Sequence, residues 1–143
     1  EALKAGGAAV GAKTVIETLP GMFPLACSPR LNDLFVENIK EYFPETKIEE
    51  AGHFTASTDM GDISHLMPSI HPFIGGVDGG PHTEDFCVTD FDAAAILPGK
   101  VFAMNIIDLL YDEAAMAKEI LEKEKPILTK EEYLAKLESY FQS

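Results

Sequence analysis

The residues with the clearest chemical potential lie between Ser57 and Phe86, in the sequence STDMGDISHLMPSIHPFIGGVDGGPHTEDF. This stretch contains His65, His71, His82 and several carboxylates, but no lysine or arginine. Carboxylates with few cations nearby suit general acid–base catalysis or the binding of a divalent cation. We therefore expect any catalytic or cation-binding site to lie in this stretch.

His82 is the best candidate for a metal ligand. It follows a loop that contains Gly79 and Gly80, and it precedes Glu84 and Asp85. A neighbouring carboxylate could hold its second ring nitrogen, as is usual for metal-bound histidines. A histidine in a loop is more often an ordinary surface residue, so the sequence leaves both interpretations open.

The other histidines have weaker patterns. His65 and His71 do not have the i, i+4 spacing of a helical zinc pair, and Pro68 lies between them, which argues against an extended segment that presents both on one face. We expect structural or substrate-contacting roles for these two. His53 has no local partner, and we expect it to be an ordinary residue.

Asp59 and Asp62 lie in the sequence S-T-D-M-G-D, over residues 57–62, which is typical of a tight turn. Either carboxylate could be a general acid, a general base or a metal ligand. Capping of the turn is the commoner use of Asp in such a pattern. The sequence lacks GxSxG, P-loop, HExxH and GxGxxG motifs, so it gives no support to a serine hydrolase, a P-loop enzyme, a zincin or a dinucleotide-binding protein.

Composition limits the class of protein. The chain of 143 residues is 46% hydrophobic and 24% charged, which fits one globular domain with a sizeable core. Its net charge of -13 would repel a phosphate backbone, so nucleic acid is a poor partner. Cys27 and Cys87 form no CxxC pattern, which favours a reducing compartment. The opening residues EALKAGGAAVGA have neither the basic region nor the apolar run of a signal peptide, and no continuous apolar stretch reaches about 20 residues, so we expect a cytoplasmic protein without a membrane partner.

Several elements must position these residues. Ser28 as N-cap and Pro29 at the first position predict a helix over 29–43, which Pro44 ends. Thr129 and Glu132 have capping-box spacing and predict the start of a last helix. We further predict a weak helix over 1–12, strands over 13–19, 47–50 and 69–74, an apolar helix over 101–110 with a kink or restart at Pro98, and a polar helix over 112–125.

The motifs S-T-D-M-G-D-I-S and G-G-P-H-T-E-D-F resemble the carboxyl-terminal part of the metal-dependent amidohydrolase and peptidase family. That family includes aminoacylase, the indole-acetyl-amino-acid hydrolases and p-aminobenzoyl-glutamate hydrolase, and the last is the most similar. The resemblance covers nearly the whole chain, but only the segment Ser57–Phe86 is specific.

The resemblance implies an α/β fold, namely the carboxyl-terminal half of a zinc-exopeptidase-like three-layer catalytic domain, preceded by the last helix and strand of a ferredoxin-like lid domain. Residues 1–20 would end the inserted lid or dimerisation domain, and residues 21–143 would belong to the catalytic domain. His82 would be a ligand of a zinc or manganese pair. The substrate-binding turn would consist of Ser57, Thr58, Asp59 and Gly61.

The family's other metal ligands and the Glu-Glu pair that supplies its general base match nothing here. The resemblance therefore implies a fragment of a metal-dependent amidohydrolase that hydrolyses an acyl-amino acid, a peptide or a p-aminobenzoyl-glutamate-like amide when intact, and that is inactive alone with its metal sites unfilled. A non-catalytic acidic binding or regulatory module built from the same half-fold is the alternative. Apolar residues cover most faces of the helix over 101–110, which predicts burial on more than one side, or self-association into a homo-oligomer if a side is left uncovered.

Overall fold

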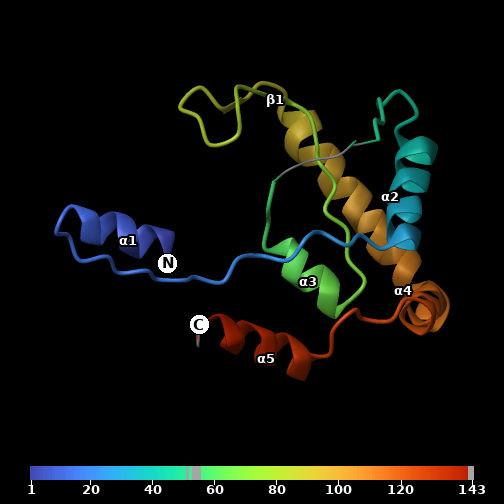
Figure 1. Cartoon of the computed structure of the whole chain (residues 1–143). Coiled ribbons are helices and arrows are strands. Elements are labelled where there is room, and N and C mark those ends of the chain that lie inside the picture. The colour runs from blue at the N-terminus through green and yellow to red at the C-terminus, as the bar shows by residue number, and fades with distance from the viewer. Residues whose placement is uncertain (51, 53–55, 142–143) are drawn as a thin grey trace. The chain divides into compact units, whose positions relative to one another are not determined.

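The computed structural model describes residues 1–50, 52 and 56–141 (Figure 1). The chain is mostly helical, with 54% helix and 3% strand. Over the described ranges there are five helices and a two-stranded hairpin, and no three-layer α/β sheet. The expected half of a three-layer zinc-exopeptidase-like α/β domain is therefore wrong for this structure.

The predicted strands account for this difference. The segments 13–19, 47–50 and 69–74 are not strands, and the sheet formed by the described residues pairs β1 (Val77–Asp78) with β2 (Cys87–Val88) in antiparallel register. β-branched residues favour an extended backbone, but a strand also needs a neighbour that exchanges backbone hydrogen bonds with it. The sequence predicted the extended segments without identifying such a neighbour, so the expected lid-domain strand is absent as well.

The chain divides into two compact units. The first combines residues 1–21 with the residues from Thr129 onward, and the second is Met22–Leu128. The first unit contains α1 (Ala2–Ala9) and α5 (Lys130–Phe141). The predicted capping box at the start of α5 is confirmed, because the Thr129 N–H donates to Glu132 Oε2 over 2.8 Å and the Glu132 N–H donates to Thr129 Oγ1 over 3.2 Å.

The second unit contains α2 (Pro29–Tyr42), α3 (Met60–Leu66), the hairpin, a π-helical turn η1 (Asp92–Ile96) and α4 (Leu97–Lys123). The predicted start of α2 is confirmed. Ser28 is the N-cap, its hydroxyl accepts a hydrogen bond from the Leu31 N–H over 3.1 Å, and Pro29 lies in the first turn. A proline there is favourable because the amide hydrogen that it lacks has no partner within the helix.

The core of the second unit lies between α2 and α4, which run side by side in Figure 1. Phe35 and Ile39 of α2 pack with the fully buried Val101 of α4. A polar contact crosses the same interface, because the Asn38 side-chain amide donates to Asn105 Oδ1 and to Asp108 Oδ2, each over 2.8 Å. This pairing satisfies polar groups that would otherwise be costly to bury between two helices.

Both predicted boundaries of this helix are found. The α-helix starts anew at Leu97, directly after η1, with Pro98 in its first turn and without a kink there. Helical geometry is lost at Tyr111, and φ is positive at Asp112, Glu113 and Ala114, so the predicted division between an apolar helix over 101–110 and a polar helix after it is confirmed, although the second helix begins only after Ala114. Asp92–Lys123 as a whole is long and apolar enough to cross a membrane by length and composition, but core helices of soluble proteins pass the same test and this helix is interrupted.

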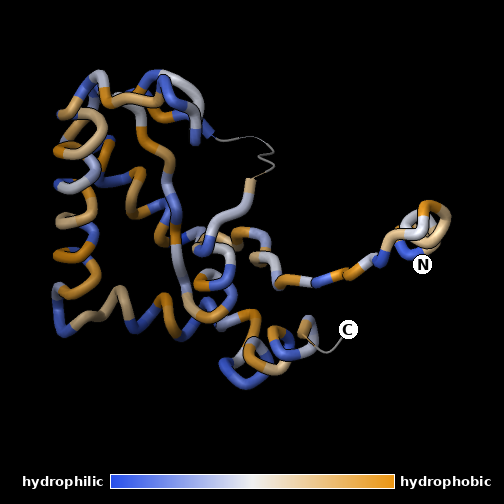
Figure 2. The backbone as a smooth tube through the Cα atoms, turned by 90° about the vertical axis from the view of Figure 1, so that its left-hand side faces the viewer, coloured by the Kyte–Doolittle hydropathy of each residue, from blue (hydrophilic) through white to orange (hydrophobic). Residues whose placement is uncertain are grey.

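The expected burial of the apolar part of α4 on more than one side is also wrong. Val101 and Asn105 are buried toward α2, whereas Ile106, Ile107 and Leu110 are 55%, 65% and 63% exposed. Figure 2 shows hydrophobic residues at repeated positions along this helix. The apolar part of α4 therefore has one covered side and one open side.

Candidate functional site

The acidic turn before α3 is folded into the second unit. The predicted tight turn over residues 57–62 is shorter than expected, because α3 begins at Met60 and takes in Gly61 and Asp62. Gly61 is buried against the backbone of Phe23, and a Cβ added to it would lie 1.8 Å from the Phe23 carbonyl oxygen. Glycine is therefore needed at position 61 for the close approach of α3 to the segment that precedes α2.

Two side chains of α3 hold the same segment. Asp62 Oδ1 accepts a hydrogen bond from the Phe23 N–H, and the Ser64 hydroxyl oxygen accepts one from the Ala26 N–H, each over 3.0 Å. The Ser64 hydroxyl itself donates to the Gly61 carbonyl over 2.7 Å. Asp62, considered above as an acid, base or metal ligand, thus anchors a distant backbone segment in this structure.

The other residues of the predicted substrate-binding turn lie at the start of α3. Ser57 and Asp59 are exposed and Thr58 is half-buried. The carbonyl of Thr58 accepts from the Gly61 N–H over 2.9 Å, and the Asp59 carbonyl accepts from the Asp62 N–H over 3.1 Å. The backbone carbonyls of this turn accept hydrogen bonds from the first residues of α3, while the Ser57 and Asp59 side chains are accessible to a ligand.

His65 and His71 are both partly buried. His65 lies in α3, its Nδ1–H donates to the Gly61 carbonyl over 2.9 Å, and its ring stacks on Phe23 with centroids 4.8 Å apart. His71 stacks on Phe73, and its Nδ1 is buried without a hydrogen-bond partner among the described residues. The structure gives His65 a structural role, while His53 lies outside the described residues.

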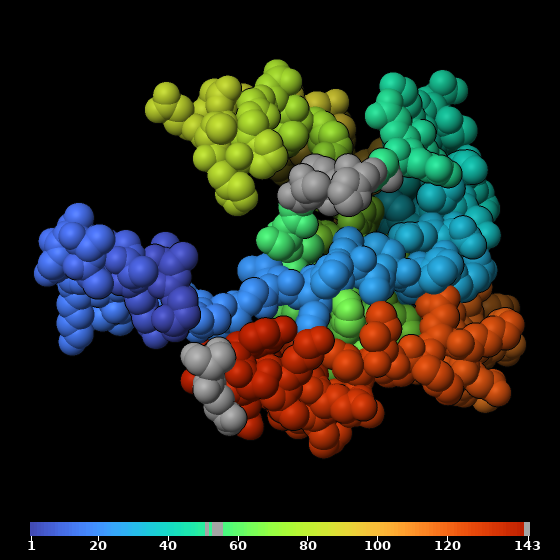
Figure 3. All heavy atoms as spheres, viewed as in Figure 1, coloured from blue at the N-terminus to red at the C-terminus, as the bar shows by residue number. Residues whose placement is uncertain are grey.

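His82 lies in the loop that joins β1 to β2, and its side chain is exposed. Its backbone has φ of 64°, a left-handed conformation that is uncommon for residues other than glycine. The loop closes at Gly79, where φ is 82° and an added Cβ would lie 2.5 Å from the Asp85 carbonyl oxygen. In Figure 3 this loop projects from the neighbouring parts of the second unit.

Thr83 and Asp85 organise the far side of this loop. The Thr83 hydroxyl lies within hydrogen-bonding distance of both the Gly80 carbonyl and Asp85 Oδ1. The hydrogen bond from Thr83 lowers the pKa of Asp85, with further help from backbone N–H groups. Over the described ranges, no hydrogen bond or ion pair joins His82 to Glu84 or Asp85, so the expected carboxylate partner of the imidazole is not in place.

The described residues do not form a metal centre by themselves. Within the described part of the chain there is no group of three or more His, Cys, Asp or Glu residues that could hold a metal ion. Zinc sites generally use three or four protein ligands. His82 could therefore contribute one ligand, and the described residues alone do not supply the other ligands of a zinc or manganese pair.

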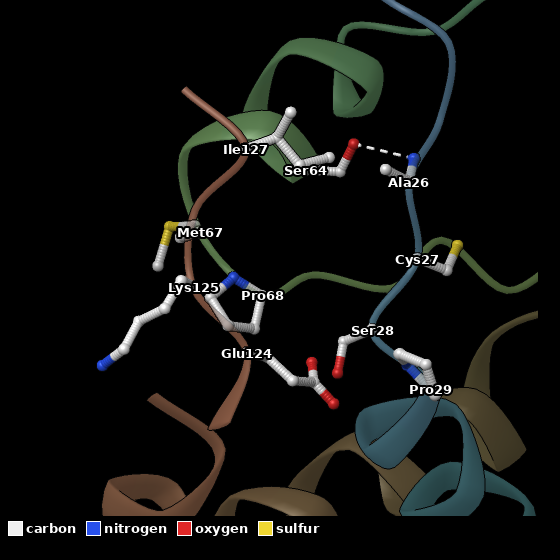
Figure 4. A pocket seen from close by; sticks show the side chains of 10 residues that line it. All are labelled: Ala26, Cys27, Ser28, Pro29, Ser64, Met67, Pro68, Glu124, Lys125 and Ile127. Atoms are coloured by element: carbon white, nitrogen blue, oxygen red, sulfur yellow. Dashed lines mark hydrogen bonds between the residues drawn. The ribbon is translucent and has the colours of Figure 1, made fainter. Parts of the chain in front are cut away.

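A cavity of about 170 Å³ lies elsewhere in the second unit, beside the start of α2 (Figure 4). None of the predicted site residues lines it. Three of its polar side chains are already used, because Ser28 caps α2, Ser64 accepts from the Ala26 N–H, and Glu124 Oε1 accepts from the Arg30 N–H over 3.2 Å. The cavity is better explained as a packing gap where α2, α3 and the end of α4 meet than as a ligand site.

Sequence reasoning missed two features near these elements. Glu124 contacts the start of α2 from the end of α4, and nothing in its local sequence indicates this long-range contact. The contact of Asn38 with Asn105 and Asp108 was also missed, although polar residues among apolar positions of two helices could have indicated it. Both features support the fold and do not extend the candidate site.

Searches of protein-family models, curated proteins and solved structures find no match to this chain.

Proposed function

We propose that this chain belongs to a metal-dependent amidohydrolase or peptidase, to which it contributes His82 as a metal ligand. The substrate class is an acyl-amino acid, a peptide or a p-aminobenzoyl-glutamate-like amide. The proposal derives from the resemblance of the segment Ser57–Phe86 to that family. Ser57, Thr58, Asp59 and Gly61 form the turn next to the substrate in this proposal, with Gly61 shaping the turn.

The observation that carries the proposal is the backbone conformation of His82 together with the exposure of its side chain. A non-glycine residue with φ of 64° is held in a costly backbone conformation, and its imidazole is exposed. Residues in strained backbone conformations are concentrated at functional sites, where the strain can be part of the mechanism. The contrast with His65, whose ring is used inside the fold, supports a ligand-binding role for His82.

The described residues do not supply the remaining metal ligands, and none of them matches the Glu-Glu pair that provides the family's general base, so no catalytic step is assigned to them. Their role in the proposed enzyme is to present one imidazole and to shape one wall of the substrate site. We expect the 143-residue chain to hydrolyse no amide by itself.

The test uses the native gene product, purified from its source cells at whatever length it has there. We expect it to contain zinc or manganese by elemental analysis and to hydrolyse N-acetyl-amino acids or p-aminobenzoyl-glutamate. Chelation should abolish hydrolysis, and the same metal should restore it. His82→Ala should lower both the bound metal per chain and the rate at least tenfold, because a ligand is lost.

Pro81→Ala is the matched control, since it changes the same loop and keeps the imidazole. It should retain most of the metal and the rate. A native protein without divalent metal and without amide hydrolysis would contradict the proposal, as would a His82→Ala variant with unchanged metal content.

An acidic binding module is the second candidate. The net charge of -13 and the lack of a metal-holding group over the described ranges favour it. A metal-free, inactive native protein that binds a basic peptide, with affinity falling as salt screens the charges, would support this alternative.

A further inference from the structure

Three consecutive residues break α4 with a left-handed backbone. The φ values are 49° at Asp112, 55° at Glu113 and 61° at Ala114, and none of the three residues is glycine. In Figure 1 the two parts of α4 run in different directions on either side of this break. Residues other than glycine adopt this conformation singly and not in runs, and aspartate tolerates it better than glutamate or alanine. Glu113 and Ala114 each disfavour the break by roughly 5- to 30-fold.

The local sequence favours an unbroken helix instead. Residues 100–125 contain neither glycine nor proline, the usual causes of a sharp bend. Residues 113–119, with the sequence EAAMAKE, are all strong helix formers. The bend must therefore be imposed by contacts of the segment that follows it. We call that segment, residues 115–128, the strap.

The strap is tied to the start of α2 and to α3. The Arg30 guanidinium donates from Nη2 to Met116 Sδ over 3.9 Å, and the Arg30 backbone N–H donates to Glu124 Oε1 over 3.2 Å. At the far end of the strap, the Leu128 N–H donates to the His65 carbonyl over 3.0 Å. These ties hold the strap in the direction that the left-handed residues require.

Little buried surface supports the ties. Within the strap, all of which the structure describes, Ile120 is the one buried residue, and Leu121 is 57% exposed. Glu124, Lys125 and Ile127 form one wall of the cavity of about 170 Å³ shown in Figure 4. Atoms that line a cavity lack packing partners on that side. A segment with few buried contacts next to a strained backbone belongs to the least stable part of a fold.

We propose that the strap is a hinged cover with two conformations. In the closed form, residues 112–114 are left-handed and the strap lies against the start of α2 and α3. In the open form, the same residues are right-handed, α4 runs unbroken from Leu97 to Lys123, and the strap no longer forms the cavity wall. Release of the backbone strain offsets the loss of the ties, so the two forms are close in free energy. The inference is independent of the proposed hydrolase function.

The experiment is a distance measurement by double electron–electron resonance on the 143-residue chain. Spin labels are attached at Ala103→Cys and Leu121→Cys, both exposed positions, in a Cys27→Ser, Cys87→Ser background. In an unbroken helix these positions lie about five turns apart on one face, roughly 27 Å along the axis. A bend between them shortens the distance. We expect a main population at a shorter distance and a second population near 27 Å that holds on the order of a tenth of the chains.

Glycine variants test the hinge. Ala114→Gly removes strain from the closed form and weakens the helix of the open form, so it should lower the ratio of open to closed chains at least tenfold. Ala117→Gly is the matched control, because position 117 is helical in the closed form and in the open form. It should leave the ratio within about twofold of that in the parent chain.

A third pair of variants tests the ties. Glu124→Ala removes the acceptor of the Arg30 N–H and should raise the ratio of open to closed chains at least threefold. Glu122→Ala, which removes an exposed carboxylate from the same strap, is the matched control and should leave the ratio unchanged. A single short distance in the parent chain and in Glu124→Ala would overturn the proposal, as would a main population near 27 Å in the parent chain or equal responses within either pair of variants.

Discussion

The two halves of the segment Ser57–Phe86 use similar residues in opposite ways. In the first half, Gly61, Asp62 and His65 are built into the fold through contacts with Phe23 and with α3 itself. In the second half, His82 has no described hydrogen bond and projects from a loop with a strained backbone. A glycine, a carboxylate and a histidine thus position the first region, while in the second the imidazole of His82 remains available for a ligand.

This contrast distinguishes residues that hold a segment of the fold in place from residues that are available to bind a ligand. Buried polar groups generally have hydrogen-bond partners, and those of α3 find them in a backbone segment nearly forty positions earlier in the chain. Residues that hold such a segment are poor candidates for catalysis, because their substitution damages the fold first. The exposed half can change with little effect on stability, and this difference can be measured.

The largest expected effect concerns the two glycines Gly61 and Gly75. Gly61→Ala should destabilise the chain by about 3 kcal/mol, because the new Cβ overlaps the Phe23 carbonyl and α3 must move away. Gly75→Ala is the matched control, since an added Cβ would meet no atom within 4 Å. We expect its unfolding midpoint in urea to be unchanged or slightly raised. Equal urea midpoints for Gly61→Ala and Gly75→Ala would contradict the proposed difference between the two halves of the segment.

Substitution by glycine should change the stability in opposite directions at His65 and at His82. His65→Gly should destabilise the chain by about 2 kcal/mol, because it adds a glycine to a helix and removes the hydrogen bond to Gly61 and the stacking on Phe23. His82→Gly should instead stabilise it by about 0.5 kcal/mol, since glycine adopts a positive φ without strain.

Urea denaturation without added metal measures both histidine variants under the same conditions. A loss of stability in His82→Gly as large as that in His65→Gly would mean that the exposed loop supports the fold. The strain argument for His82 would then fail.

Some of this organisation could be predicted from the sequence. The start of α2 at Ser28 and Pro29, and the capping box of Thr129 and Glu132, depend on residues a few positions apart, so local rules found them. The loop position of His82 followed equally from the adjacent glycines.

Other features depend on distant partners or on tertiary packing and could not be predicted. The sequence around Asp62 indicates a turn, but its hydrogen bond goes to Phe23, which no local pattern identifies. Three predicted strands failed because their pairing partners could not be read from the segments themselves. The division of α4 near Tyr111 was predicted from the change of an apolar to a polar helix, but the positive φ of residues 112–114 was not, because residues 111–114 contain neither glycine nor proline.

Substitutions at Asp62 and Asp85 should also differ in their effect on stability, but by less than those of the glycines and the histidines. Asp62→Ala should cost about 1–2 kcal/mol, because the Phe23 N–H loses its acceptor. Asp62→Asn keeps an acceptor oxygen and should recover at least half of that loss. Asp85→Ala, in the exposed loop, should change stability by less than about 0.5 kcal/mol, as expected for a surface position. Urea unfolding curves with equal slopes would check the order, and an equal cost at positions 62 and 85 would contradict it.

The smallest expected effect is a pKa change in the exposed loop without a change in fold. Thr83→Val removes the hydroxyl that donates to Asp85, so the pKa of Asp85 should rise toward its ordinary value. In the wild-type chain this pKa is lowered in the folded state. Any stabilisation from the ionised carboxylate is therefore present above the pKa of the unfolded chain and is lost as the pH falls through that of the folded chain.

NMR titration of the Asp85 side-chain carboxyl carbon measures this shift. Glu132 is an internal control, because its pKa is lowered by Thr129 in the other unit and should not respond to Thr83→Val. Identical Asp85 titrations in the two chains would show that the hydroxyl does not hold the carboxylate. A shifted titration with an unchanged urea midpoint would show that the loop around His82 can be altered electrostatically while the fold stays intact, a property that the turn at Gly61 lacks.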